Sequence, residues 1–406
     1  MKRALTLILA LCFIFTMFAA CGTSDNGTGD GSSSDNGTEA SSTGGKVIKI
    51  GIFEPASGDN GAAGKQETLG YEYAHSLTPT VDIDGETYTV ELEYVDNESS
   101  TDKAATAAST LISKGVSIVL GSYGSAVCIA SSQVFADAKI PVLAPTSTNP
   151  QVTLDNTHYF RMCFLDPFQG TVLANFAVEQ FDAKNAYVLA KLGDDYSVGL
   201  ATYFRQAFEE LGGTVTYETF PEGTSDYNSY VVNAKNSGAD IFFSPTSTEA
   251  AALIIEQATA QGWDKPILAG DTWDSNVITS AATGKDITLY ITTFYQEGGN
   301  IEFDSGFKDW LNANSDKLAS NNGNDQISAI SPMAFDAYYV ALEAIKSAGS
   351  TDSVAINEAL WDVQYNGVTG HIEFDEIGDA KRSDAVVKKV NSDTGLWEYV
   401  TTQGVK

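Results

Sequence analysis

The sequence is poor in the residues that most often carry out chemistry in proteins. Its 406 residues include 3 histidines and 4 cysteines. His75, His158 and His371 are dispersed along the chain, in no spacing typical of a nucleophilic or metal site, and no G-x-S-x-G motif occurs. We therefore expect no enzymatic activity, no bound metal and no cofactor.

Positive charge is also scarce. The chain has 23 Lys and Arg residues against 53 Asp and Glu residues, which gives a formal net charge of −30. Nucleic acids and anionic membrane surfaces are themselves negative, so both repel such an acidic chain. The charge excludes these partners, and its simplest role is to keep the protein soluble.

The start of the chain is typical of a targeting segment. Two basic residues precede an apolar run, Ala4–Ala20, that ends in FAACG at 18–22. The pattern resembles a bacterial lipoprotein signal spanning 1–21, in which Cys21 becomes the lipidated first residue of the mature protein. The alternatives are an uncleaved membrane anchor and an ordinary secretory signal. Each of these places the bulk of the chain outside the cytoplasm, and lipidation would hold it on the cell membrane.

The composition of residues 22–46 predicts a flexible tether. This stretch has no aliphatic residue larger than Ala and cannot bury a core. A tether after an acylation site would hold a folded domain at the membrane surface. The two cysteines that follow the tether, Cys128 and Cys163, can either pair or remain free buried thiols.

From Val47 onward, short apolar strands alternate with helices. Each apolar run is bounded by turn residues and fits a strand buried on both faces. The series occurs twice, which predicts two domains, each with a parallel sheet covered by helices on both faces. We also expect 370–374 and 385–390 to form a closing hairpin. The expected strands of the two series are 47–54, 89–95, 118–120, 141–144 and 159–164, then 186–192, 214–220, 241–244 and 266–269.

The stretch from Ile118 to Pro150 contains the best candidate for a binding site. Two short strands in it each end in a turn of small and hydroxyl residues where a helix begins. Ser125 and Thr148 follow the ends of neighbouring strands, each where a helix begins. Helix N-termini with such hydroxyl residues can bind a small anion, typically a carboxylate. The alternative is that both residues are plain helix caps. Neither turn carries a strong base or a metal ligand, so we expect the site to hold a ligand and not to convert it.

Seven segments of the chain carry a family resemblance, in an order that spans nearly the whole mature sequence. They are IGIFEPASGDNGAAG, VLGSYGSAV, IPVLAPTSTNPQVT, YFRMCFLDPFQGTVLANFA, GDDYSVG, ILAGDTWDSN and GVTGHIEFDEIGD. The chain resembles type I periplasmic binding proteins, specifically the branched-chain amino-acid-binding lipoproteins of ABC importers. The resemblance implies a two-lobed α/β fold with several hinge crossovers. Lobe 1 would comprise 47–165 plus 294–366, and lobe 2 would comprise 166–293 plus 367–406.

The resemblance also implies which lobe 1 residues hold the ligand. Ser125 and Thr148 would bind its carboxylate through hydroxyl and backbone N–H groups. The carbonyl of Tyr123 or Thr146, together with the Thr146 hydroxyl, would accept hydrogen bonds from its ammonium group.

From lobe 2, Tyr196 would close over the amino-acid backbone of the ligand. An acidic residue near a strand end, Asp271 in preference to Asp274, would pair with the ammonium. Thr246 stands where the branched-chain binders have a Tyr, and Trp273 would form the floor of the side-chain pocket. These departures leave the choice of amino acid open.

The implied function is the extracytoplasmic solute-binding component of an ABC importer. A monomer would capture a free amino acid, of the branched-chain type or related, between two closing lobes and deliver it to a membrane permease. Two alternatives stay open at this point. One is a ligand-sensing module for a membrane receptor, and the other is a binder of a small amide, a urea-like compound or an aromatic compound.

Overall fold

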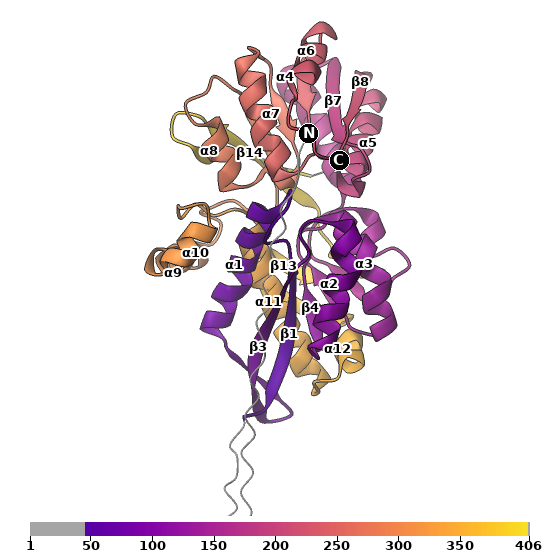
Figure 1. Ribbon diagram of the computed structural model, residues 1–406, viewed down its shortest axis with the longest axis vertical. Helices are drawn as coiled ribbons and strands as arrows, with labels where there is room; N and C mark the ends of the chain where they lie inside the picture. The colour runs from indigo at the N-terminus through magenta and orange to yellow at the C-terminus, as the bar shows by residue number, and fades with distance from the viewer. Residues whose placement is uncertain (1–44, 405–406) are drawn as a thin grey trace, which may run out of the picture. The chain divides into compact units, whose positions relative to one another are not determined.

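The structure is a computed structural model that describes residues 45–404, which lie within one compact unit. The predicted lipoprotein signal, its Cys21 and nearly all of the predicted tether lie outside the described residues. The described chain is an α/β protein built on two large sheets, in agreement with the predicted class (Figure 1). None of its described helices is both long enough and apolar enough to cross a membrane.

The first sheet contains six strands in the order β2-β3-β1-β4-β5-β6. Its strands are β1 (Val47–Glu54), β2 (Thr80–Ile83), β3 (Glu86–Asp96), β4 (Ile118–Leu120), β5 (Val142–Ala144) and β6 (Tyr159–Arg161). Neighbours pair in parallel except β2 and β3, which form an antiparallel hairpin. Its turn residues, Asp84 and Gly85, both have positive φ, as an Asp-Gly hairpin turn requires.

The second sheet contains seven strands in the order β15-β14-β11-β10-β9-β7-β8. Its strands are β7 (Asn185–Lys191), β8 (Thr214–Phe220), β9 (Ile241–Phe243), β10 (Ile267–Ala269), β11 (Leu289–Thr293), β14 (Asp384–Asn391) and β15 (Leu396–Gly404). The five strands from β7 to β11 are parallel, whereas β14 runs antiparallel to both β11 and β15.

The predicted closing hairpin of 370–374 with 385–390 is wrong. The first segment, β13 (Gly370–Glu373), pairs with β12 (Gln364–Gly367), and the second, β14, joins the second sheet. Each segment has a nearer partner in the chain, and a short connection costs less entropy to close than a longer one.

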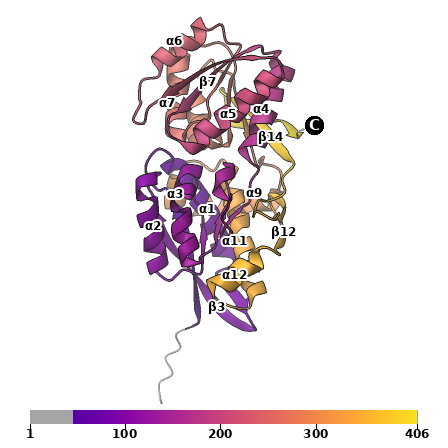
Figure 2. The same ribbon diagram turned by 90° about the vertical axis from the view of Figure 1, so that its right-hand side faces the viewer.

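Helices cover both faces of each sheet, as predicted (Figures 1 and 2). Side chains of β1 alternate between two cores: Ile48, Ile50 and Ile52 face α1 and α11, whereas Phe53 faces α2 and α3. The helices are α1 (Gly61–Leu77), α2 (Thr101–Ser113), α3 (Ser125–Ala138), α4 (Asp166–Phe181), α5 (Asp195–Glu210), α6 (Asn228–Asn236), α7 (Thr248–Ala260), α8 (Asn276–Ala282), α9 (Ile301–Ala313), α10 (Ser315–Ser320), α11 (Ile330–Ala348) and α12 (Ser353–Leu360).

The chain crosses between the two sheets three times. It leaves the first sheet after β6, returns after β11 to place α9, α11 and α12 in the first core, and crosses again before β14. Ile372 and Phe374 still pack in the first core. The lobe boundaries given above stay a prediction.

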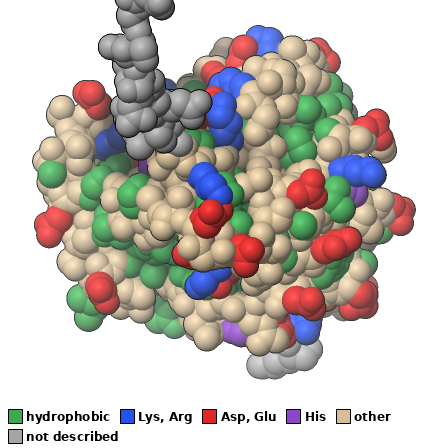
Figure 3. Space-filling model, turned by 90° about the horizontal axis from the view of Figure 1, so that it is seen from below, with side chains coloured by type: hydrophobic (Ala, Val, Ile, Leu, Met, Phe, Trp, Pro, Cys, Tyr) green, Lys and Arg blue, Asp and Glu red, His purple; other side chains and the backbone are tan. Residues whose placement is uncertain are grey.

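Two buried ion pairs stabilise the region where the chain crosses between the sheets. Arg161 Nη2 lies 2.6 Å from Asp379 Oδ1, and Lys388 Nζ lies 2.9 Å from Asp274 Oδ2. Removing one partner of such a pair leaves a buried charge alone, which is strongly destabilising. On the surface, acidic side chains are scattered with basic ones between them over the face drawn in Figure 3.

Candidate ligand-binding site

A cavity lies where the carboxyl ends of strands from both sheets meet. This is the position at which open parallel sheets commonly bind ligands. From loops after first-sheet strands it is lined by Asp59, Asn60, Ser99, Tyr123, Gly124, Ser125, Thr146 and Ser147. From the second sheet it is lined by Lys191, Asp194, Tyr196, Ser247, Asp271 and Thr272.

The structure brings most of the predicted ligand residues together at this cavity. The predicted residues that line it are Tyr123, Ser125, Thr146, Tyr196 and Asp271. The side chains of Thr148, Thr246 and Trp273 are fully buried beside or behind it. Their individual roles stay a prediction.

The N-terminus of α3 is open toward the cavity. Its first residue is Ser125, and Gly124 before it has φ 104°, a left-handed conformation that suits glycine. Within residues 45–404 no side chain caps this end of α3. By contrast, α5 and α7 also begin at the cavity but are capped by Asp194 and Ser247. The N–H groups of α3 are therefore the ones left for an anion.

Two hydroxyl groups flank that helix end. Ser125 Oγ accepts a hydrogen bond from Asn149 N at 3.2 Å, which leaves its hydrogen free to donate. Thr148 Oγ1 lies close enough to the Asp166 carboxyl to lower its pKa somewhat, yet neither the Thr148 hydroxyl nor the Asp166 carboxyl makes a hydrogen bond of good geometry within the described residues. Burial raises the pKa of Asp166 well above its usual value, which favours the neutral acid.

The neighbouring loop of the first sheet offers a hydrogen-bond acceptor. Thr146 Oγ1 donates to the two carboxylate oxygens of Glu67 at 3.0 and 3.1 Å. A hydroxyl has one hydrogen, so while Glu67 is ionised and holds that hydrogen, the Thr146 oxygen is left to accept a hydrogen bond from a ligand. Glu67, on α1, is buried, and burial raises its pKa to about 8.

Asp271 follows β10 and faces the cavity from the second sheet. Its Oδ1 accepts hydrogen bonds from Gln169 Nε2 at 2.9 Å and from Tyr196 Oη at 3.1 Å. Burial raises the pKa of Asp271 to about 7. A cationic group in the cavity would therefore meet a carboxyl that ionises readily once a positive charge is beside it.

Sequence reasoning missed Glu67 and Gln169. The signal for Glu67 was present: it lies four residues after Ala63 and three before Gly70, on the buried face of α1. A carboxylate on an otherwise apolar helix face needs a partner, and this partner is Thr146. Gln169 gave no comparable signal, because only packing decides that α4 directs it toward Asp271.

Trp273 and Thr246 belong to the structure around the cavity. Trp273 packs in a core of the second sheet with residues of α7, α8 and β10. The Thr246 carbonyl accepts a hydrogen bond from Thr272 Oγ1 at 2.9 Å and so orders the loop after β10.

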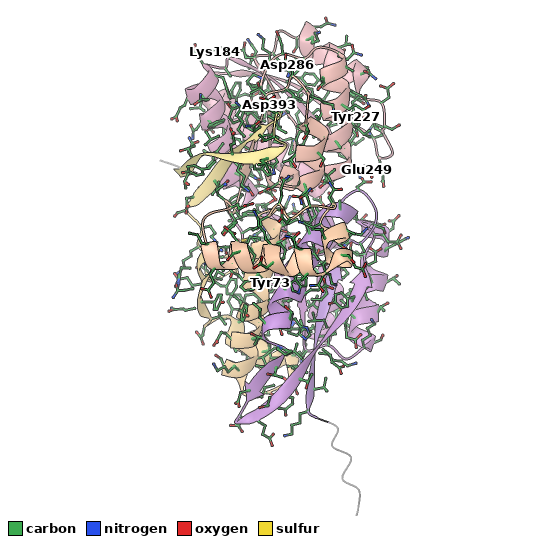
Figure 4. All side chains as sticks on the ribbon, turned by 90° about the vertical axis from the view of Figure 1, so that its left-hand side faces the viewer. Tyr73, Lys184, Tyr227, Glu249, Asp286 and Asp393 are labelled. Atoms are coloured by element: carbon green, nitrogen blue, oxygen red, sulfur yellow. The ribbon has the colours of Figure 1, made fainter. Side chains whose placement is uncertain are left out.

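Contacts across the cavity join the two halves of the chain. Lys191 Nζ lies 2.5 Å from Asp59 Oδ2, and Glu249 N donates to Asp59 O at 3.3 Å. Deeper in the cavity, Tyr123 Oη donates to Thr272 O at 3.3 Å. Figure 4 shows Glu249 at the end of α7 that approaches the first sheet. The cavity is thus closed over by side chains from both sides.

The sequence profile of the periplasmic binding protein family matches residues 47–394. The chain belongs to this family. A Leu/Ile/Val-binding protein homologue of Brucella abortus is 30% identical over 366 residues, covering 87% of this chain and 93% of the homologue. The periplasmic binding protein is therefore a type I member related to the leucine/isoleucine/valine binders.

Two solved structures agree with this assignment. The leucine-binding protein LivK of Thermotoga maritima superposes with a TM-score of 0.77 at 32% identity, covering 88% of this chain and 99% of that one. LivJ of Streptococcus pneumoniae, a branched-chain amino-acid transporter substrate-binding protein solved with isoleucine, gives a TM-score of 0.75 at 26% identity, with 89% and 99% coverage.

These relatives make the chain a solute-binding protein of the ABC-transporter type and not an enzyme. The predicted two-lobed fold is confirmed with them, as is a place of action outside the cytoplasm. Cys128 and Cys163, for which pairing was left open, are both free and buried in the part of the chain described. The same part contains no group of three or more His, Cys, Asp or Glu residues arranged to hold a metal.

Proposed function

We propose that this periplasmic binding protein captures a free amino acid and delivers it to an ABC permease. The observation that carries the proposal is the opposed chemistry of the two sides of the cavity. One side has the uncapped N-terminus of α3 with the free hydroxyl hydrogen of Ser125. From the second sheet this helix end is faced by Asp271, and beside α3 on the first-sheet side Thr146 adds an oxygen that accepts while Glu67 holds the Thr146 hydrogen. A zwitterion matches both sides at once.

The buried Thr148 hydroxyl adds to this argument. A buried polar group without a partner costs free energy, typically about 1–3 kcal/mol. Thr148 lies one residue before Asn149, whose N–H bonds Ser125, so its hydroxyl is close to the same helix end. A ligand carboxylate placed on α3 would give this hydroxyl an acceptor.

Delivery requires that the ligand be released, and hence that the cavity open. The contacts across the cavity are polar, and Asp59, which pairs with Lys191, is partly exposed. Exposed ion pairs are typically worth about 0–1 kcal/mol, so closure of this kind is readily reversed. A cleft whose closed form is stabilised by weak contacts can reopen readily, as a protein that delivers its ligand requires.

A thermal-shift screen tests the amino-acid proposal, because a ligand that binds only the folded state raises its stability. Each L-amino acid is compared with its carboxamide and with the corresponding acid that lacks the amino group. We expect at least one amino acid to raise the melting temperature, and both of its analogues to act far more weakly. An amide or a deaminated acid that acts as strongly as the amino acid would refute zwitterion recognition.

A further inference from the structure

We infer that the ligand's side chain is small, polar and uncharged, ending in a hydroxyl or a carboxamide, and is not a branched aliphatic group. The inference rests on the proposed amino-acid function, since it concerns the part of the cavity beyond the zwitterion. It is drawn from the cavity lining, from an apolar cluster that the lining conceals, and from one oriented carboxamide.

The lining of the cavity contains no aliphatic side chain in the described chain. Its apolar surface comes from the rings of Tyr123 and Tyr196, whose hydroxyl groups are hydrogen-bonded at the zwitterion end. Sites for apolar ligand groups are lined mainly by hydrophobic side chains. A leucine or valine side chain would instead remove water from polar groups and leave them without partners, which is unfavourable.

The nearest apolar surface is already covered. Ala63, Tyr123 and Ile330 form a small buried cluster in which Ala63 and Ile330 are 0% and 1% exposed. Neither of these two residues lines the cavity. The Tyr123 ring packs against Ala63 and Ile330, and its hydroxyl is fixed by the hydrogen bond to Thr272 O. No aliphatic wall is therefore offered to the ligand by the residues that the structure describes.

The outer rim of the cavity disfavours a charged side chain of either sign. Lys191 is paired with Asp59, and Asp194 caps α5 by accepting from Ser197 N at 2.8 Å. An anionic side chain would meet two carboxylates, those of Asp59 and Asp194, against one ammonium group. A cationic side chain would find neither carboxylate free, because Asp59 is paired with Lys191 and Asp194 caps α5. Like charges at close range are costly where solvent is partly excluded.

Asn60 is the group best placed to recognise a polar side chain. Its Oδ1 accepts from Thr248 N at 3.4 Å, which orients the carboxamide. Its Nδ2 then points toward Gly124, lying 3.8 Å from where a Cβ of that residue would stand. Its backbone N–H is held by Ser99 Oγ at 3.0 Å. The Asn60 amide thus presents a donor beside Gly124, next to the helix end proposed to hold the carboxylate, from where it can reach an oxygen of the ligand's side chain. An equal loss of affinity for every amino acid in the variant described below would instead assign Asn60 to the carboxylate.

Calorimetry with side chains of matched shape tests the inference on the purified chain. Threonine is compared with valine, and asparagine with leucine, aspartate and 2,4-diaminobutyrate. We expect threonine or asparagine to bind at least tenfold more tightly than its matched analogues. Equal or tighter binding of valine or leucine overturns the inference while the proposed function stands. If no amino acid binds at all, the proposed function itself fails.

Asn60→Leu tests the assignment of the recognising group. We expect the preference for asparagine over leucine, or for threonine over valine, to fall at least fivefold in this variant. The control is Asn236→Leu, at an exposed position at the end of α6, which should keep the parent preference. Thermal unfolding of both variants verifies that they fold. An unchanged preference in Asn60→Leu overturns the role of this residue.

Discussion

The direction of a few hydroxyl hydrogens decides what this cavity can bind. Thr146 gives its hydrogen to Glu67 and keeps an acceptor for the ligand, whereas Ser125 accepts from Asn149 N and keeps a donor. Two chemically similar hydroxyl groups would therefore serve opposite ends of the proposed zwitterion. Neighbouring residues, and not the hydroxyl residues themselves, set this difference.

Loss of the donors at the carboxylate end should weaken binding of every ligand alike. We expect Ser125→Ala and Thr148→Ala each to cost about 1.5–3 kcal/mol, the range for hydrogen bonds to charged groups. The loss should be the same for each amino acid, because these hydroxyl groups meet only its carboxylate. Calorimetry with two different amino acids measures it. If both variants bind like the parent protein, Ser125 and Thr148 are plain structural residues.

Ionisation of Asp271 should make binding depend on pH. Its pKa of about 7 in the folded protein lies above the ordinary value of 3.8, so the carboxyl is largely neutral below pH 7. An ammonium group binds the charged form, and affinity should therefore rise about tenfold from pH 6 to pH 8, as that form becomes populated. Calorimetry across this range, with accompanying proton release, measures the effect.

The raised pKa of Asp271 also makes the stability of the ligand-free protein depend on pH, in the direction opposite to the dependence of its affinity. Between pH 3.8 and 7 the folded state holds a proton on Asp271 that the unfolded state has lost, so stability falls as pH rises through this window. Asp271→Asn should lessen that fall, to which Glu67 and Asp166 also contribute through their raised pKa values, and should flatten the affinity profile. The exposed Asp286→Asn is the matched control and should retain both slopes. A pH-independent affinity in the parent protein would contradict ammonium pairing.

At the scale of secondary-structure elements, close packing of α5 on the end of β10 positions the second-sheet half of the site. A Cβ on Gly270 would lie 2.7 Å from Leu200 Cδ2 and would overlap the Tyr196 hydroxyl. This hydroxyl is the one that bonds Asp271. Glycine at the end of β10 is thus what lets a tyrosine of α5 reach the site.

Gly270→Ala should therefore affect both stability and binding. We expect a loss of about 1–3 kcal/mol in the free energy of unfolding, the usual range for overpacking, together with weaker ligand binding. Denaturant unfolding and calorimetry measure the two effects. Gly45→Ala, where no atom lies within 4 Å of the new Cβ, is the control and should change neither. Normal binding in Gly270→Ala would show that the Tyr196 contact with Asp271 is dispensable.

At the scale of the whole molecule, we expect the cleft to close on its ligand. The contact between Asp59 and Lys191 and that between Tyr123 and Thr272 can form only when the two halves approach. Small-angle scattering should show a smaller radius of gyration with saturating amino acid than without it. An unchanged radius would argue against hinge closure.

Lys191→Met should loosen the closed form without touching the zwitterion contacts. Because Lys191 pairs with a partly exposed Asp59, we expect a modest effect, about 0.2–1 kcal/mol, seen mainly as faster ligand dissociation. Stopped-flow measurements report this rate. The exposed pair of Lys184 with Asp182 offers a control, Lys184→Met, that should leave dissociation unchanged. A dissociation rate equal to the parent's in Lys191→Met would show that this ion pair does not hold the cleft closed.

Membrane attachment is a separate prediction for the whole chain. Cys21→Ser should abolish lipidation and release the protein from the membrane fraction, because the lipid is its expected anchor. Cell fractionation followed by immunoblotting measures this, with Cys128→Ser as a control that should stay membrane-bound. A Cys21→Ser protein that remains in the membrane would favour an uncleaved apolar anchor at Ala4–Ala20.

Much of the fold could be predicted because its signals are local. Apolar runs bounded by turn residues predicted β1, β4 and β8 closely. The strands that were missed include β2, β12 and β15. β2 and β15 lie at sheet edges, where partners and not composition make a strand, and β12 pairs with β13 alone among the described strands.

The sequence by itself determined the βα order, the lack of catalytic motifs and the loops that line the cavity, because each depends on residues close together in the chain. Only the tertiary structure decided that Trp273 lies in a core, that Glu67 takes the Thr146 hydrogen and that Tyr123 covers the nearest apolar surface. Each of these depends on a neighbour supplied by a different element. Such neighbours set the direction of a hydrogen bond and the surface against which an aromatic ring packs. No periodic pattern in the sequence encodes either of these.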